Sequence, residues 1–99
     1  MSYKIKEDMK YRSRIDIISQ ILEVANGRNA TKTKIMHSAL LSYNQLKEYL
    51  MLLTEKDLLR YNEDTQTFKT TEKGLRFLQL YNQIDNIIKA TEAPEQQQI

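Results

Sequence analysis

The sequence predicts a small α+β fold, mostly α, in which three helices precede a two-stranded hairpin and a longer helix follows it. Three observations carry this prediction. Apolar residues recur at helical spacing in residues 15–25, 35–40 and 46–53. Two short strand-like segments, 58–61 and 68–70, flank a polar tip, and a helical pattern begins again after Thr71. This order is typical of a winged helix-turn-helix, which presents one amphipathic helix to the major groove of DNA.

The first helix is expected to begin after Ser13, because Ser13 and Asp16 have the spacing of a capping box. Asn26-Gly27 ends it, since both residues tolerate the left-handed conformation that a helix C-cap needs. A short strand near Ala30 and Thr31 is expected in the polar connection that follows. The apolar residues of this helix are Ile15, Ile18, Ile21, Leu22 and Ala25.

Two further helices follow in close succession. Thr33 is expected to cap the second, and the small Ala39 near its end allows close approach to the third. Ser42 opens the third helix, with Gln45 three residues later as a second capping box. The apolar face of the third helix consists of Leu46, Tyr49, Leu50 and Leu53. Its opposite face carries Asn44, Lys47, Glu48, Met51 and Glu55.

The polar hairpin tip, residues 62–67, is the predicted wing. Thr71 is expected to cap the last helix, and Gly74 in its first turn indicates close packing, because glycine is otherwise unfavourable in a helix. The helix is expected to reach about Thr91. The chain thus divides into a flexible basic arm (1–12), a winged helix-turn-helix domain (13–74), a C-terminal dimerisation helix (71–91) and a disordered tail (92–99).

Composition excludes several classes of function. The 99 residues contain no cysteine, so disulfides, thiolate zinc sites and thiol nucleophiles are absent. The single histidine, His37, has no carboxylate cluster near it and is not a metal site. With only two glycines, a phosphate-binding loop is hard to build. We therefore expect no enzyme, no cofactor and no metal.

The chain is also expected to be a soluble cytoplasmic protein without a membrane partner. No apolar run approaches the roughly 18 residues of a membrane span, and the N-terminus has no signal-peptide core. The net charge of +2 permits nucleic-acid binding. It argues against coating DNA by charge alone, because nonspecific affinity scales with the number of phosphates neutralised.

The third helix is the predicted recognition helix. Its first exposed residues are Tyr43, Asn44, Gln45 and Lys47. Asparagine and glutamine can pair bidentately with adenine, and lysine can reach guanine or a phosphate. The alternative is an ordinary polar face on a buried helix, and Glu48 opposes DNA contact unless it accepts from a cytosine amino group.

The wing gives a weaker signal. Glu63 and Asp64 at its tip repel phosphate, so the tip is not expected to enter the minor groove. Arg60 and Lys69 on the flanking strands are candidates for contact with the DNA backbone, or are plain solvated charges.

The last helix carries an apolar stripe close to a heptad seam, formed by Phe77, Leu80, Tyr81, Ile84, Ile87 and Ile88. A helix of roughly 20 residues is about 30 Å long, more than a domain this small covers. We expect the stripe to be the interface of a homodimer, because leaving it exposed is costly. The alternative is packing along residues 15–22 of the same chain.

Three motifs together resemble archaeal winged-helix DNA-binding proteins of the Sulfolobus 10a type: TKTKIMHSALLSYNQLKEYLMLL, LTEKDLL and TTEKGLRFL. The resemblance covers residues 13–88. It implies a dimer joined by an antiparallel coiled coil of the C-terminal helices, and binding to double-stranded DNA. It puts Ser42, Tyr43, Asn44, Gln45 and Lys47 at the start of the recognition helix, and Thr31, Lys32 and Lys34 in a basic lead-in. The acidic wing and the shorter last helix depart from the family.

The sequence therefore predicts a homodimeric, sequence-preferring double-stranded DNA-binding protein, either a transcriptional regulator or a nucleoid-associated protein. Arg28, Lys32 and Lys34 are expected to hold phosphates, together with the cations of the N-terminal arm. The alternative is a protein-interaction adaptor with little affinity for DNA, since a winged helix does not fix function.

Overall fold

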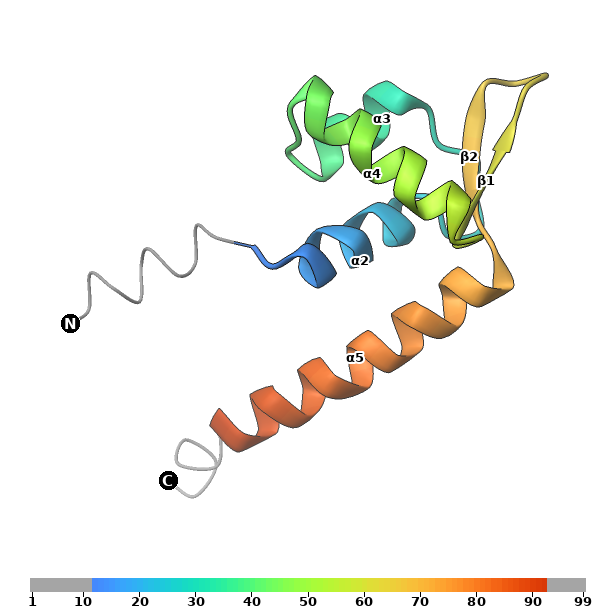
Figure 1. Ribbon diagram of the computed structural model, residues 1–99. Coiled ribbons are helices and arrows are strands. Elements are labelled where there is room, and N and C mark those ends of the chain that lie inside the picture. Colours follow the sequence, from blue (N-terminus) through green and yellow to red (C-terminus); the bar gives the residue numbers. More distant parts are fainter. Residues whose placement is uncertain (1–11, 93–99) are drawn as a thin grey trace.

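The computed structural model describes residues 12–92. The predicted arm falls almost entirely outside this range, as does all of the predicted tail beyond Glu92. The elements are α2 (Arg14–Val24), α3 (Lys32–Ser38), α4 (Tyr43–Glu55), β1 (Leu59–Asn62), β2 (Thr67–Thr70) and α5 (Glu72–Glu92). Figure 1 shows α2 between α4 and α5, with the hairpin projecting at one end and α5 running along α2 and beyond it.

Side-chain caps set the starts of the first three helices. The Oγ of Ser13 accepts from the N–H of Asp16, whose carboxylate accepts from the N–H of Ser13, so the first predicted capping box is confirmed. Ser42 and Gln45 form the second in the same way.

The predicted cap at Thr33 is wrong. Thr31 is the N-cap of α3, and its Oγ1 accepts from the N–H of Lys34 at 3.1 Å. Both threonines have the right chemistry, but only Thr31 follows directly on extended backbone. Ala30 pairs with Phe68 through two backbone hydrogen bonds of 2.9 and 2.8 Å. In place of the short strand predicted near Ala30 and Thr31, the structure has this single bridge. The bridge leaves Thr31 extended, the conformation that an N-cap requires.

The ends of α3 and α4 share one geometry. In each, the second residue past the cap returns its N–H to the helix: Leu41 to the carbonyl of Met36, and Leu58 to that of Leu53. This Schellman motif requires a left-handed residue between, a place that glycine usually fills. Here the two residues are Leu40 (φ 55) and Asp57 (φ 62).

The hairpin pairs β1 and β2 antiparallel, with Leu59 opposite Thr70 and Asn62 opposite Thr67. The turn between them spans residues 63–66, within the predicted wing. The hairpin is joined to the helices where the hydroxyl of Thr70 donates to the carbonyl of Leu22 at 2.7 Å.

The core lies where α2, α3, α4 and the hairpin meet, and its largest fully buried side chains are Ile21, Leu22, Ile35, Leu46, Leu53 and Leu59. Thr71 caps α5 as predicted, since its Oγ1 accepts from the N–H of Gly74 at 3.0 Å. Gly74 is also confirmed as a close-packing position. A Cβ there would clash with the carbonyl oxygen of Leu58 and come within 2.7 Å of the Thr70 methyl.

Candidate nucleic-acid interface

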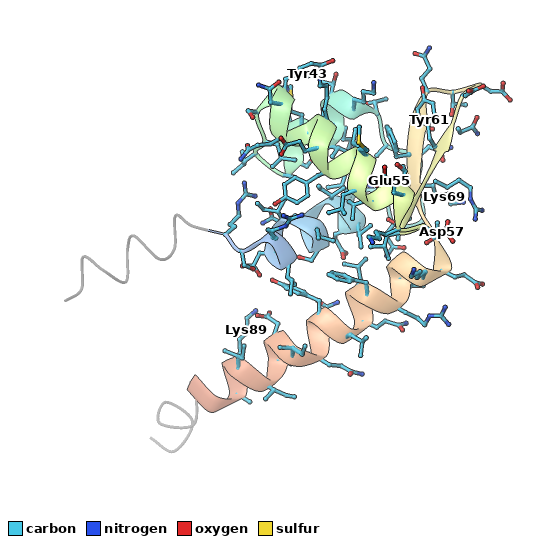
Figure 2. All side chains as sticks on the ribbon, in the orientation of Figure 1. Tyr43, Glu55, Asp57, Tyr61, Lys69 and Lys89 are labelled. Carbon is cyan, nitrogen blue, oxygen red and sulfur yellow. The ribbon has the colours of Figure 1, made fainter. Side chains whose placement is uncertain are left out.

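The exposed face of α4 is the centre of the candidate site. Leu46, Leu50 and Leu53 bury one side of the helix, so its other side faces solvent. That side carries Tyr43, Asn44, Lys47, Glu48, Met51 and Glu55. Figure 2 shows Tyr43 at the start of the helix and Glu55 at its far end, with α5 on the opposite side of the domain.

The start of α4 divides the predicted base-reading residues by role. The side chains of Ser42 and Gln45 are bonded to each other's backbone N–H, at 3.2 and 3.0 Å, and so fix the helix start. Tyr43, Asn44 and Lys47 remain exposed beside them. The Lys47 ammonium lies 5.1 Å from the centre of the Tyr43 ring, a cation–π contact that orients both side chains.

The predicted phosphate-binding residues lie on neighbouring parts of the surface. Lys32 and Lys34 are exposed in the first turn of α3, while the Thr31 hydroxyl is used as the cap of that helix. Lys32 lines the same groove as Lys47. Arg28 is exposed in the connection between α2 and α3.

That groove runs between α4 and the hairpin and measures about 480 Å³. Its floor and walls are mainly apolar, from Leu50, Met51, Tyr61 and Phe68. The ring of Tyr61 packs against that of Phe68, with 4.8 Å between centroids. Sequence reasoning placed Met51 on the exposed face of α4 but gave it no role, and it did not single out Tyr61. The alternation of side chains along β1 was the available signal, because it sets Tyr61 on the face opposite Arg60.

Arg60 and Lys69 lie directly opposite each other in the hairpin. They line a separate hollow of about 660 Å³, together with the acidic Glu63, Asp64 and Glu72. The structure therefore brings these two cations together, but on the hairpin face that points away from the groove beside α4. Lys69 projects from the outer side of the hairpin in Figure 2.

The predicted dimer stripe on α5 divides into two parts. Phe77 is half-buried against the core, and next to it Leu78 is buried. Farther along, Leu80 and Ile84 are 60% and 58% exposed. Ile87 and Ile88 are also exposed, and the hollow of about 330 Å³ beside this stripe includes Ile15 of α2. The first part therefore packs on its own chain, while the second presents apolar side chains to solvent.

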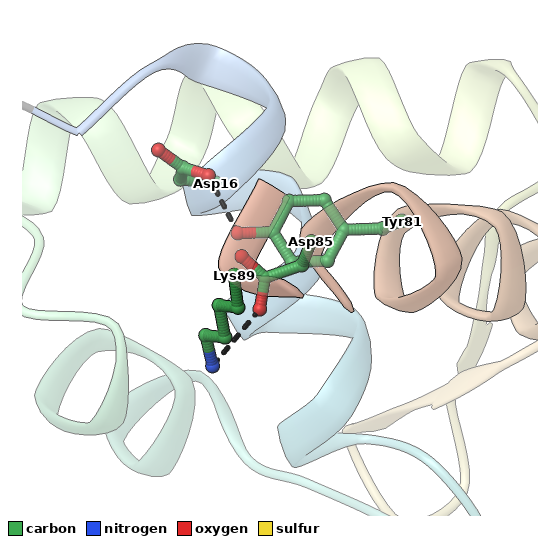
Figure 3. A network of polar contacts seen from close by, with 4 residues as sticks. All are labelled: Asp16, Tyr81, Asp85 and Lys89. Atoms are coloured by element: carbon green, nitrogen blue, oxygen red, sulfur yellow. Dashed lines mark hydrogen bonds and ion pairs between the residues drawn. The ribbon is translucent and has the colours of Figure 1, made fainter. Parts of the chain in front are cut away.

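Tyr81 lies at the boundary between these parts. Its hydroxyl donates to a carboxylate oxygen of Asp16 at 2.6 Å, as Figure 3 shows. This bond lowers the pKa of Asp16, and it raises the pKa of Tyr81, with burial acting in the same direction on the tyrosine. One turn farther along α5, Asp85 pairs with Lys89 at 3.1 Å within the helix.

Within residues 12–92, no three His, Asp or Glu side chains are grouped closely enough to hold a metal ion. No helix in this part of the chain has the length and apolar character needed to cross a membrane.

Comparisons with known proteins agree with this architecture. A family model described as winged helix-turn-helix matches residues 11–89. The solved structure of Sso10a-2, a DNA-binding protein from Sulfolobus solfataricus, superposes with a TM-score of 0.73. The two share 18% sequence identity, and the match covers 87% of this chain and 92% of that one. No curated protein matches the sequence. The resemblance predicted from the motifs is thus confirmed at the level of the fold.

Proposed function

The chain belongs to the winged helix-turn-helix family, and on that premise we propose that it binds double-stranded DNA as a homodimer, with α4 of each protomer in a major groove. The observation that carries the proposal is the face of α4. Asn44 and Lys47 stand exposed on a helix whose other side is fixed in the core. An α-helix fits the width of the major groove, where asparagine pairs with adenine and lysine reaches guanine or phosphate.

Contacts with phosphates would set the register of the complex. Lys32 and Lys34 are exposed at the start of α3, and Arg28 is exposed in the connection before it. Such contacts fix orientation but carry no sequence information. Arg60 and Lys69 have a smaller role in this proposal, because they lie beside the acidic wing tip and on the other face of the hairpin. The similar solved structure is of a protein described as DNA-binding, which supports the proposal.

A salt titration with random-sequence duplex tests DNA binding. The affinity should fall with salt, and Lys34→Ala should weaken binding to all sequences alike. The log–log salt slope should decrease by about 0.9 for each phosphate that the variant no longer neutralises. Arg76→Ala is the matched control, because Arg76 is an exposed cation on α5, before the stretch proposed to dimerise. A complete lack of binding at low salt would instead favour a protein-interaction adaptor.

The homodimer is supported by the exposed part of α5. Burying an isoleucine contributes about 1.5–3 kcal/mol, and Ile84 and Ile88 are 58% and 49% exposed on one face of one helix. Replacing both by lysine should convert a dimer into a monomer in sedimentation equilibrium. Leu40→Lys changes an equally apolar, exposed residue away from α5 and should leave the assembly unchanged. A wild-type monomer at high concentration would refute the dimer.

Selection of bound sequences from a random duplex pool separates the two biological roles. Enrichment of a palindrome supports a dimeric transcriptional regulator, because a two-fold protein matches a two-fold site. Binding without enrichment supports an architectural, nucleoid-associated protein. Either role would place the protein on chromosomal DNA in the cytoplasm.

A further inference from the structure

The groove between α4 and the hairpin contains an apolar surface that the proposed contacts leave unused. Met51 is 64% exposed, and Tyr61, across the groove from it, is 40% exposed. A single exposed apolar side chain is ordinary on a protein surface. Two that line one groove, on the face carrying the candidate DNA contacts, require an explanation.

Met51 lies in line with the residues proposed to read DNA. It follows Lys47 by four residues and Asn44 by seven, so all three lie on one face of α4. From Asn44 to Met51 the helix rises about 10 Å, which is close to the width of the major groove, about 12 Å. A duplex that contacts Asn44 and Lys47 therefore passes over Met51 as well.

The floor of the groove is apolar because Thr54, which also lines it, turns its hydroxyl toward the backbone of α4. The hydroxyl of Thr54 donates to the carbonyls of Leu50 and Met51, at 2.8 and 3.1 Å. Tyr61 is held in place by its ring contact with Phe68, which is itself buried. The groove thus offers a fixed apolar surface, with Lys32 and Lys47 among its lining residues.

An apolar surface flanked by cations matches one feature of double-stranded DNA. In the major groove, thymine carries a C5-methyl group, whereas cytosine presents a hydrogen at that position. The lysines favour a partner that carries phosphates over an uncharged one. The apolar side chains favour the thymine methyl over the polar edges of G·C pairs.

We propose that Met51 and Tyr61 form a thymine-methyl contact, through which the protein prefers A·T pairs under the middle of α4. The inference rests on the proposed DNA binding and adds the base class that the site selects. Burying one methyl group in an apolar contact is worth about a fourfold gain in affinity.

Paired duplexes of alternating sequence test the contact directly. The first is an alternating A·T duplex, and the second is the same duplex with uracil replacing thymine, which removes only the methyl groups. Fluorescence anisotropy with the full-length chain should show binding to the thymine duplex that is at least about fourfold tighter. A G·C duplex carrying 5-methylcytosine should likewise bind more tightly than its unmethylated form.

Two substitutions of similar size assign the effect to Met51. Met51→Leu keeps an apolar side chain and should keep the thymine-to-uracil ratio. Met51→Gln replaces it by a polar one and should bring the ratio close to one, while Leu40→Ala, an exposed apolar residue outside the groove, should not change it. Because Met51 lies on the surface, both of its variants should fold like the wild type, and a circular dichroism melt verifies this.

The outcomes separate this inference from the proposal on which it rests. Equal binding of both duplexes by the wild type, with a normal salt dependence, overturns the methyl contact but leaves DNA binding intact. A ratio that persists in Met51→Gln also overturns it, because the methyl groups would then act through DNA shape. No binding to any duplex overturns the proposed function itself.

Discussion

The bond between Tyr81 and Asp16 gives the sharpest stability prediction, because it joins α5 to the start of α2. Tyr81→Phe removes the hydroxyl that donates to Asp16 at 2.6 Å and leaves the rest of the side chain in place. Hydrogen bonds to charged groups contribute about 1.5–3 kcal/mol. Both side chains are half-buried, and solvent screens their interaction. We therefore expect a loss of about 1 kcal/mol near pH 7, or about 4–8 °C in Tm.

The pH dependence of this loss follows from the two pKa shifts. The pKa of Asp16 lies below its ordinary value of 3.8, so its contribution is present above the unfolded pKa and is lost as the pH falls through the folded one. The pKa of Tyr81 lies above 10.0, so the contribution of the tyrosine is present below pH 10 and is lost as the pH rises through its folded pKa. The difference between wild type and Tyr81→Phe should be constant from about pH 5 to 9. As the pH falls through the folded pKa of Asp16 it should shrink to roughly half, because the bond that remains after protonation is neutral.

Urea denaturation followed by circular dichroism, at several pH values and two protein concentrations, measures this difference. Tyr43→Phe is the matched control. Tyr43 is 58% exposed, and no hydrogen bond from its hydroxyl is found within residues 12–92. Removing that hydroxyl should therefore change the free energy of unfolding little. If Tyr81→Phe is as stable as wild type at pH 7, or if its deficit does not change at low pH, the assigned bond to the carboxylate is refuted. A deficit that varies with protein concentration would place the effect in dimerisation instead.

Three further predictions concern single positions. Gly74→Ala should lower stability by about 1–3 kcal/mol in urea denaturation, because the added Cβ meets the Leu58 carbonyl; an unchanged midpoint would contradict the close packing. Leu40→Gly should raise stability by about 0.5–1 kcal/mol, since it removes left-handed strain from a side chain that is 77% exposed. Leu40→Ala, which keeps the strain, should not. Asn44→Ala should cost about 1–3 kcal/mol on a preferred DNA site and relax base choice there; unchanged affinity on that site would remove the base-reading role.

The order of elements could be predicted because each boundary has a local chemical signal. Ser13 and Ser42 carry capping boxes that the structure confirms, and Gly74 marks the point where α5 meets the backbone of Leu58. Where two residues carry the same signal, local reasoning fails. Thr31 and Thr33 are both good N-caps, and the choice between them depends on the bridge between Ala30 and Phe68, which are far apart in the sequence.

The candidate site was predictable to the extent that it lies on one helix. Periodicity alone assigns Asn44 and Lys47 to the exposed face of α4. The groove was not predictable, because it requires α4 and β1 to lie side by side. No local pattern relates Met51 to Tyr61, and the direction of Arg60 and Lys69 away from that groove depends on the same packing.

α5 divides into a packed part and an exposed part at the point where its contacts with the rest of the domain end. Gly74 abuts the backbone of Leu58, Leu78 is 3% exposed, and Tyr81 is bonded to Asp16. These three anchors fall within about 10 Å of helix and fix the direction in which α5 leaves the domain. Beyond Tyr81, the ion pair in Figure 3 lies within the helix itself and adds no further anchor. In the proposed dimer, the spacing between the two copies of α4 therefore depends on that direction and on the stretch after Tyr81. Any change to the Tyr81–Asp16 bond should alter half-site spacing before it alters base choice.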